Sequence, residues 1–480
     1  MTFVIGWVSD DLQLNQDFIG MYHLQKTDAE TITKGIKDIL LRCNLLLSNC
    51  RWQGYDGAAA MSSDINGVVG KIIAENPAAI YLHCANHCLD LALKDSVKEN
   101  ATLRDALDFV QELSVFIKGS PKRMEEYKII AGEYAESESL HLLCPTRWTI
   151  RTRSITATIK SYSPIYKTLA LIASESVKRE IKDKANGLRK KMESFDCFFG
   201  LSVAKNIFSV CEQVASTLQG QGMTAQTSLK CINALQTSLQ QQRDGFDGVF
   251  KSMKHNAEIK GFIGTPAVPR LKKVPKRLQY GESPQHLNTD VNQHYRVLYV
   301  DSIDQMKGEI DKRFQQSSYH ILASIESLLI DSANGKGTTV SINTKELYEQ
   351  NIDFPKLEAE LPLLSGMVKQ GLPDIYKVTS MDTLAQLFNE DEAASLLMPN
   401  TVRLLKIYLL APMSIAAGER TFSVLRRIKT YIRNSMTDKR TNNLMILHIH
   451  KDKTDALNLT DIAKQFVQAN ERRMRFFGKY

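Results

Sequence analysis

Apolar and polar residues along the N-terminal part of the chain are arranged first as in strands and then as in a helix. Residues 3–8 and 17–24 are rich in apolar side chains, and a polar turn at residues 9–11 separates them, so we expect a β-hairpin. Thr27 or Asp28 can cap the helix that follows, because apolar residues then recur three and four positions apart. The chain is therefore predicted to begin with two strands and a helix.

The same change of pattern recurs further along the chain. Residues 50–55 and 79–82 are short apolar and aromatic runs that predict two more strands, and residues 88–97 carry the apolar face of a helix. Asp56 directly follows the first of these strands. A side chain at this point leads out of the packed core, which is a usual position for a functional carboxylate in a sheet covered by helices. The order of elements predicts an α/β fold.

Residues 153–392 show helical periodicity throughout. We expect helices at residues 154–171, 177–192, 195–218, 227–253 and, as one long helix, 290–329. A basic segment with prolines, residues 265–277, is predicted to be a linker between the last two. Its cations either face solvent or bind DNA phosphates, and they are Arg270, Lys272, Lys273, Lys276 and Arg277.

The C-terminal part of the chain predicts one buried helix and two amphipathic helices. Residues 402–410 are apolar almost all round, which indicates a helix that is buried on most sides. The apolar faces of the next two helices consist of Phe422, Leu425 and Ile428, and then Leu444 and Leu447. The same region carries the most basic face of the chain, formed by Arg426, Arg427, Lys429, Arg433, Lys439 and Arg440.

The composition is that of a globular protein. A chain of 480 residues can hold two or three domains, or one core with a large insertion, and 43% hydrophobic with 24% charged residues supply a core. The net charge of +8 permits contact with nucleic acid without requiring it. The eight cysteines are scattered, which favours free thiols. No apolar run approaches the roughly 18 residues of a membrane span, so no membrane partner is expected.

Several stretches, taken together, resemble the hAT transposase superfamily. The first is "QGYDGAAAMSS", which continues through "GVVGKI" to "PAAIYLHCANHCLDLAL", within residues 53–93. The others are "LLCPTRWTIR" (142–151), "PAVPRLKKVPKR" (266–277), "HYRVLYVDSIDQMKGEIDKRF" (294–314) and "GERTFSVLRRIKTYIRNSM" (418–436). The resemblance is to transposase-derived proteins with an RNase H-like core, similar to the zinc finger MYM-type and BED-type proteins but lacking the zinc finger.

This resemblance implies an α/β fold in which an RNase H-like mixed sheet, missing its first strand, is split by a large all-α insertion. The expected domains are the first part of the core (1–150), the helical insertion (151–392), a core-closing and dimerisation region (393–452) and a helical tail (453–480). The dimerisation residues would be Phe422, Leu425, Ile428, Leu444 and Leu447; the alternative is that their helices only complete their own domain.

The resemblance also implies an acidic site that is incomplete. Asp56 matches the second acidic position of the family and Glu419 the third, whereas the first carboxylate would lie on a strand upstream of Met1. DNA strand transfer uses two Mg²⁺ ions held by several converging carboxylates, so Asp56 and Glu419 would bind Mg²⁺ only if the missing carboxylate were supplied. Without it, no cofactor and no catalysis are expected. As alternatives, Asp56 is an ordinary turn residue before glycine and Glu419 a first-turn helix residue. Asp10 and Asp11 are weaker substitutes, because a hairpin turn lies at the wrong end of the strands.

A cluster of His83, Cys84, His87 and Cys88 has three interpretations. Two of them are a zinc site, for which Cys144 is a single further ligand, and a packed junction between a strand and a helix. The resemblance adds a third, in which Cys84 and His87 handle the DNA end beside the active site.

Arg147 and Trp148 form a second candidate pair for handling DNA. An arginine for a phosphate and a flat aromatic ring for an unstacked base would suit a distorted DNA end. The alternative is a buried Trp148 covered by the stem of Arg147.

The sequence thus predicts a decayed hAT transposase-like protein that is catalytically inactive and self-associates through its C-terminal region, with no small-molecule substrate. DNA is a possible partner, and any binding to it is expected to be non-specific. The resemblance places it in the nucleus; without the resemblance we would expect the cytoplasm. Two alternatives stay open: a fragment of an active transposase, and a protein-interaction scaffold that does not bind DNA.

Overall fold

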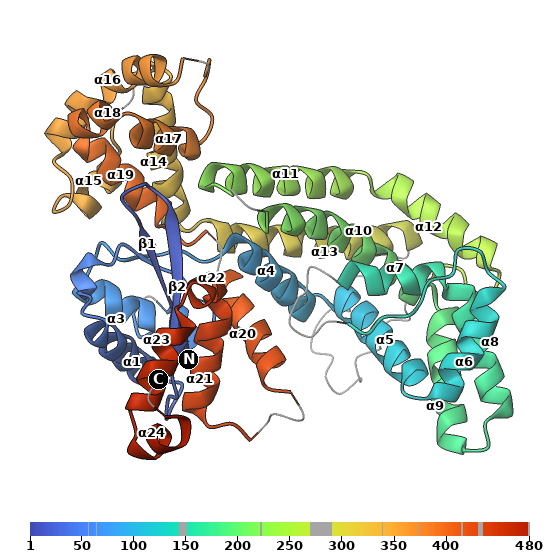
Figure 1. The fold of residues 1–480 in the computed structure, drawn as a ribbon. Helices are drawn as coiled ribbons and strands as arrows, with labels where there is room; N and C mark the ends of the chain where they lie inside the picture. The colour runs from blue at the N-terminus through green and yellow to red at the C-terminus, as the bar shows by residue number, and fades with distance from the viewer. Residues whose placement is uncertain are drawn as a thin grey trace, which may run out of the picture. The chain divides into compact units, whose positions relative to one another are not determined.

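The computed structural model describes residues 1–55, 57–63, 65–143, 151–220, 223–268, 290–337, 339–373, 375–413, 416–430 and 435–478. The chain divides into two compact units (Figure 1). The first, which we call the split unit, combines Met1–Leu82 with Ser324–Tyr480, and the second, the helical unit, consists of His83–Ala323. The split unit is therefore built from the two ends of the chain.

The split unit begins with the predicted β-hairpin. Strands β1 (Thr2–Val8) and β2 (Leu14–Met21) pair antiparallel, with a bulge after Phe3. Helix α1 (Ala29–Arg42) follows, and its N-terminus is capped by Asp28, whose carboxylate accepts the Thr31 N–H at 2.9 Å. The predicted hairpin and the Asp28 cap are confirmed.

A second small sheet pairs two strands that are far apart in sequence. Strands β3 (Trp52–Gln53) and β4 (Ile80–Tyr81) are parallel, and α2 (Ala59–Ser62) and α3 (Val68–Glu75) lie between them in the chain. Helices α1 and α3 pack together around a buried cluster of Ile32, Ile36, Val68, Ile72 and Ala79. Phe3 from β1 and Tyr55 after β3 pack on the same cluster, so both sheets share one core.

The mixed α/β character of the fold is confirmed. Among the described residues, however, the strands form two separate two-stranded sheets. A single split RNase H-like sheet that lacks its first strand remains a prediction.

The helical unit contains α4 (Ala85–Glu99), α5 (Ala101–Lys118), α6 (Pro121–Gly132), α7 (Thr152–Lys160), α8 (Tyr162–Glu175), α9 (Arg179–Glu193), α10 (Phe195–Leu218), α11 (Ala225–Asp244), α12 (Phe246–Lys260) and α13 (Val291–Phe314). An aromatic cluster fills its centre, with Tyr295 of α13 packed edge-on to Phe195 and Phe199 of α10 at centroid distances of 5.2 and 4.9 Å. Helices α4 and α5 pack on α13 and α10, so they belong to this unit although they precede residue 151. The sequence-based domain boundaries remain predictions.

Three predicted helices are broken in the structure. The segment 227–253 is interrupted at Gly245, whose N–H bonds back to the Gln241 and Gln242 carbonyls and ends α11. The segment 290–329 is interrupted after Phe314, and the segment 154–171 at Ser161. The apolar spacing continues across each break, so periodicity alone did not reveal them. The prediction of 195–218 as one helix is confirmed.

The second half of the split unit is helical. It consists of most of α14 (Ser317–Ala333), α15 (Ile342–Tyr348), α16 (Phe354–Gly371), α17 (Met381–Glu390), α18 (Glu392–Leu397), α19 (Pro399–Leu409), α20 (Ala416–Ile428), α21 (Asp438–Ile449), α22 (Lys451–Asp455), α23 (Leu459–Gln468) and α24 (Glu471–Phe477). Helix α20 packs against β1 and α21 against β2 (Figure 1). None of the helices in the described ranges has the length and apolar character needed to cross a bilayer.

Candidate dimerisation region and acidic site

The predicted acidic pair lies mostly outside the described residues. Asp56 is not described, and Glu419 lies on α20, where only its backbone is described. Asp10 and Asp11, the weaker candidates, contact C-terminal helices instead: the Asp10 carboxylate pairs with Lys406 at 3.2 Å, and the Asp11 carbonyl accepts the Asn389 side chain at 2.6 Å. Within the described ranges, no three His, Cys, Asp or Glu side chains are arranged to hold a metal. A metal site at Asp56 and Glu419 remains a prediction.

The His83–Cys88 cluster lies at the start of α4 and is tightly packed. Cys84 is the N-cap residue, and Cys88 is buried with its sulfur 3.6 Å from the Gln316 amide. The His83 carbonyl accepts the Tyr319 hydroxyl at 2.5 Å, and the His83 and His87 rings are 5.1 Å apart.

Burial sets the protonation states in this cluster. It lowers the pKa of His83 to about 4, with His87 and Arg313 adding to the shift, and it raises the pKa of Cys88 to about 12. The contacts of Cys88 with the Gln316 amide and of the His83 carbonyl with Tyr319 are those expected of a packed junction, and the zinc site remains a prediction. Cys144, Arg147 and Trp148 lie outside the described residues, so the roles in handling DNA remain predictions for Cys84, His87, Arg147 and Trp148.

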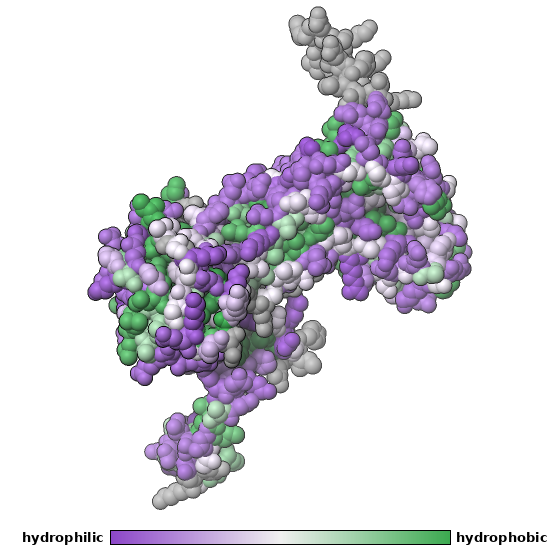
Figure 2. Space-filling model, turned by 90° about the horizontal axis from the view of Figure 1, so that it is seen from above, coloured by the Kyte–Doolittle hydropathy of each residue, from purple (hydrophilic) through white to green (hydrophobic). Residues whose placement is uncertain are grey.

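The predicted dimerisation residues differ in exposure. Phe422 on α20 is 56% exposed and Leu447 on α21 is 46% exposed. Leu425, Ile428 and Leu444 are half-buried, so they face partly into the split unit. Figure 2 shows hydrophobic patches between larger hydrophilic areas on one face of the molecule.

Sequence reasoning missed a further exposed pair, Leu396 and Leu397 at the end of α18. Two adjacent leucines directly before a Met-Pro helix boundary were the available signal.

The open edge of β2 is covered by polar side chains from α21 and its C-terminal end. The Met21 N–H donates to Asn442 Oδ1 at 2.8 Å, and His450 Nε2 donates to the Phe18 carbonyl at 3.0 Å. A Cβ at Gly20, whose φ is 155°, would lie only 3.0 Å from the Asn442 amide, so the close approach requires glycine. These side chains supply partners that a third strand would otherwise provide.

An ion pair extends this contact. The Asp17 carboxylate accepts Lys453 Nζ and Trp7 Nε1, each at 2.8 Å, and these two bonds hold the pKa of Asp17 below its usual range. We call the contact of Asp17, Phe18 and Met21 with Asn442, His450 and Lys453 the hairpin clasp.

Helix α19 is anchored to the second sheet and to α16. The Trp52 indole N–H donates to the Ile407 carbonyl at 2.8 Å in a buried position. At the other end of α19, the buried Glu360 carboxylate accepts the N–H groups of Asn400 and Thr401 at 3.2 and 2.7 Å and their side chains at 2.8 and 2.9 Å. The C-terminal segment is therefore bonded to both N-terminal sheets of the split unit.

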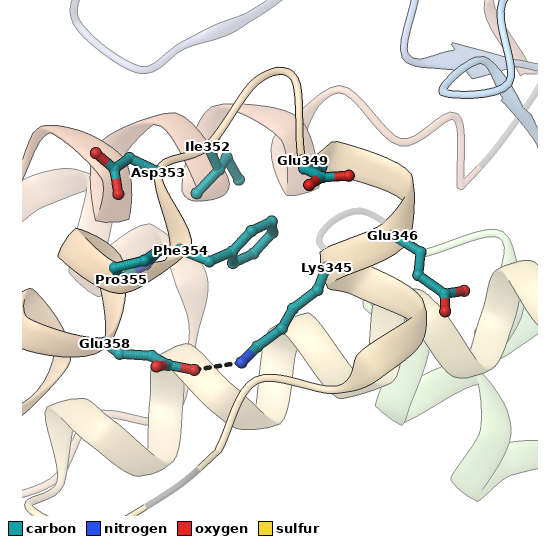
Figure 3. Close-up of a pocket in the computed structure, with 8 residues that line it drawn as sticks. All are labelled: Lys345, Glu346, Glu349, Ile352, Asp353, Phe354, Pro355 and Glu358. Carbon is teal, nitrogen blue, oxygen red and sulfur yellow. Dashed lines mark hydrogen bonds and ion pairs between the residues drawn. The ribbon is translucent and has the colours of Figure 1, made fainter.

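A cavity of about 500 Å³ lies between α15 and the start of α16 (Figure 3). Its lining mixes apolar side chains with carboxylates. Glu358 pairs with Lys345 at 2.5 Å, and Glu346 and Glu349 come from α15 and its C-terminal end. It contains none of the predicted site residues.

Comparison with known proteins finds family matches in the N-terminal and C-terminal parts of the chain. A family model described as "ZMYM1/FAM200, RNase-like domain" matches residues 1–67, and one described as "hAT family C-terminal dimerisation region" matches residues 387–452. The chain is similar to the 52 kDa repressor of the inhibitor of the protein kinase from Mus musculus, with 24% identity, and from Homo sapiens, with 23%. Each alignment covers 95% of this chain but only 60% of the relative's length. The predicted resemblance to transposase-derived proteins of the hAT family is confirmed by these matches, which cover an RNase-like domain at the N-terminal end and a dimerisation region near the C-terminal end.

Proposed function

We propose that this chain is a catalytically inactive hAT-derived protein that associates with itself through its C-terminal region and acts in the nucleus. The observation that carries the proposal is the hairpin clasp. It supports a C-terminal region that is folded onto the RNase-like segment and still presents Phe422 and Leu447 to solvent. The relatives are named repressors, which supports a role other than transposition.

Exposed apolar residues in a dimerisation region are the expected contact points between two copies. Burying a whole phenylalanine side chain contributes about 1.5–3 kcal/mol, so the exposed half of Phe422 would contribute about 1 kcal/mol to each side of the interface. A charge at this position also has to be desolvated when the copies meet. We therefore expect Phe422→Asp to raise the dimer dissociation constant by about tenfold or more.

Sedimentation equilibrium over a range of concentrations tests this proposal. Val177→Asp is the matched control, because Val177 is 99% exposed on the helical unit. Self-association of the unchanged chain that Phe422→Asp weakens and Val177→Asp leaves intact supports the proposal. A chain that stays monomeric at every concentration, or two variants that behave alike, contradicts it. Mg²⁺-dependent nicking of DNA by the purified chain contradicts the catalytic inactivity.

Non-specific DNA binding is a second candidate function, and the charge on α20 and α21 favours it. The basic residues on α20 and α21, and Lys429 directly after α20, are exposed: Arg420, Arg426, Arg427, Lys429, Lys439 and Arg440. Contacts with phosphates release counterions, so affinity for a duplex of random sequence should fall on the order of tenfold or more between about 50 and about 200 mM salt.

Charge-reversal variants test whether DNA binds this basic face or responds only to the net positive charge of the chain. Arg426→Glu with Arg427→Glu should weaken binding measured by fluorescence anisotropy. Lys178→Glu with Arg179→Glu, an exposed pair on the helical unit, should have a smaller effect. Equal losses in both double variants, or no binding at low salt, would remove DNA from the proposed function.

A further inference from the structure

The two last helices form a hairpin with an unusually apolar surface. Helices α23 and α24, which we call the C-terminal hairpin, pack on each other and lie beyond residue 452, where the family match ends. Leu459 is 76% exposed and Phe476 is 81% exposed. Ile462, Phe466, Met474 and Phe477 are each about half exposed. Leu459, Ile462 and Phe466 are three and four positions apart, so they form one stripe along α23.

Contacts between side chains help to order part of this surface. The Phe477 ring lies edge-on to the Phe466 ring at a centroid distance of 6.4 Å and to the Phe476 ring at 4.9 Å. The Arg473 guanidinium lies 3.9 Å from the Phe466 ring centre and donates to the Phe466 carbonyl at 3.2 Å. Side chains that are already ordered lose little conformational freedom on binding, which favours docking.

The size of the patch also indicates a contact surface. Phenylalanine side chains each bury about 150–250 Å² in a core, so the exposed parts of the three in this hairpin leave roughly 300 Å² of aromatic surface in water. That is comparable to the largest apolar patch on a typical monomer, before the aliphatic stripe on α23 is added.

The hairpin continues the dimerisation region. Thr454 of α22 donates its hydroxyl to the Leu447 carbonyl at 3.0 Å, which ties the start of the tail to the exposed leucine of α21. Leu457, about half exposed, lies between this bond and α23. The tail therefore begins at the dimerisation region, and Leu457 and Leu459 are the next large exposed apolar residues along it.

The charges around the patch are mixed in sign. Asp461 and Glu471 accompany Lys464, Arg472, Arg473 and Arg475 on the same hairpin. Two copies related by a twofold axis could pair these opposite charges, since each surface would meet its own copy. A purely basic rim would instead favour an anionic surface.

We propose that the C-terminal hairpin docks on the C-terminal hairpin of a second copy of this chain and extends the dimer interface beyond the family's dimerisation region. The extension rests on the self-association proposed above. The stripe on α23 and the rings of Phe476 and Phe477 would form its apolar centre.

Sedimentation equilibrium of the full chain tests the extension. Phe476→Asp and Leu459→Asp are each expected to raise the dimer dissociation constant by about tenfold, whereas Phe476→Leu and Val177→Asp leave it nearly unchanged. A photo-crosslinking amino acid at position 476 provides a readout that does not depend on a destabilising change. It should join two chains, with the attachment mapped to residues 459–477 of the second copy.

The outcomes separate this proposal from the previous one. A chain that is monomeric throughout overturns both. Dimerisation that Phe422→Asp weakens but Phe476→Asp does not overturns only the extension. The reverse pattern supports the extension and contradicts the contact at Phe422. Dimers in which position 476 gives no crosslink overturn the extension. The extension is also overturned if the chain sediments with anionic vesicles and Phe476→Asp abolishes that binding but leaves the dimer intact.

Discussion

The buried carboxylate of Glu360 should hold the N-terminal end of α19 in place. Pro399 is the first residue of this helix, so the N–H groups of Asn400 and Thr401 have no partner within it. Glu360 accepts both, together with the Asn400 amide and the Thr401 hydroxyl, at 2.7–3.2 Å and with a side chain that is only 6% exposed. Glu360→Ala removes the acceptor of all four bonds at once.

The expected cost follows from those four donors. Hydrogen bonds to a charged group each contribute about 1.5–3 kcal/mol, and each buried donor that loses its partner costs about 1–3 kcal/mol. Water can enter part of the space that alanine leaves. We therefore expect Glu360→Ala to reduce the free energy of unfolding of the split unit by about 3–5 kcal/mol, as for other broken buried ionic networks.

Glu358→Ala on the same helix is the matched control. Glu358 pairs with Lys345 at 2.5 Å, but the two side chains are 47% and 40% exposed, so the pair should contribute no more than about 1 kcal/mol. Urea unfolding followed by tryptophan fluorescence measures both variants, because Trp52 bonds to the other end of α19. Similar urea midpoints for Glu360→Ala and Glu358→Ala would refute the structural role of the Glu360 carboxylate.

The remaining predictions concern pH and the hairpin clasp. Burial holds the pKa of His83 at about 4 in the folded protein, whereas an unfolded histidine has a pKa of about 6.5. Between these two values the unfolded chain binds a proton at His83 that the folded protein does not bind. The contribution of neutral His83 to the free energy of unfolding of the helical unit should be fully present above about pH 6.5 and fall by up to about 3 kcal/mol toward pH 4. His83→Gln should make the free energy of unfolding less dependent on pH. Equal pH slopes in thermal melting of the two proteins would contradict this cause. Asn442→Ala should speed hydrogen exchange of the Met21 amide, with a loss of about 1 kcal/mol, because that N–H loses its acceptor. An unchanged rate would show that the clasp does not protect β2.

Local patterns in the sequence predicted much of the fold. Apolar runs with a polar turn gave the hairpin, Asp28 marked the start of α1, and the apolar face of residues 195–218 gave α10 at its observed bounds. The interruption at Gly245 was missed, because one glycine does not disturb the spacing of the apolar residues around it.

Contacts between distant segments left no such signal. Asn442 and His450 bond to backbone groups of β2, and backbone groups are the same at every position of a sequence. Glu360 resembles any surface glutamate of a helix, although it is buried. The resemblance to a known family, which the two family matches confirm, indicated the RNase-like domain and the dimerisation region, and periodicity alone did not. The pairing of Asp56 with Glu419 and the roles of Arg147 and Trp148 remain predictions.

Because the split unit combines both ends of the chain, it can be completed only late in synthesis on the ribosome. The Met21 amide and its acceptor on Asn442 are 421 positions apart, so a ribosome that adds about 5–20 residues per second needs roughly 20–80 s to deliver the second after the first. Residues 83–323, which form the separate helical unit, emerge in that interval, while the nascent β-hairpin waits with an unpaired strand edge. We expect newly made chains to need chaperones during this wait, and dilution from denaturant to give more aggregate than synthesis in the cell.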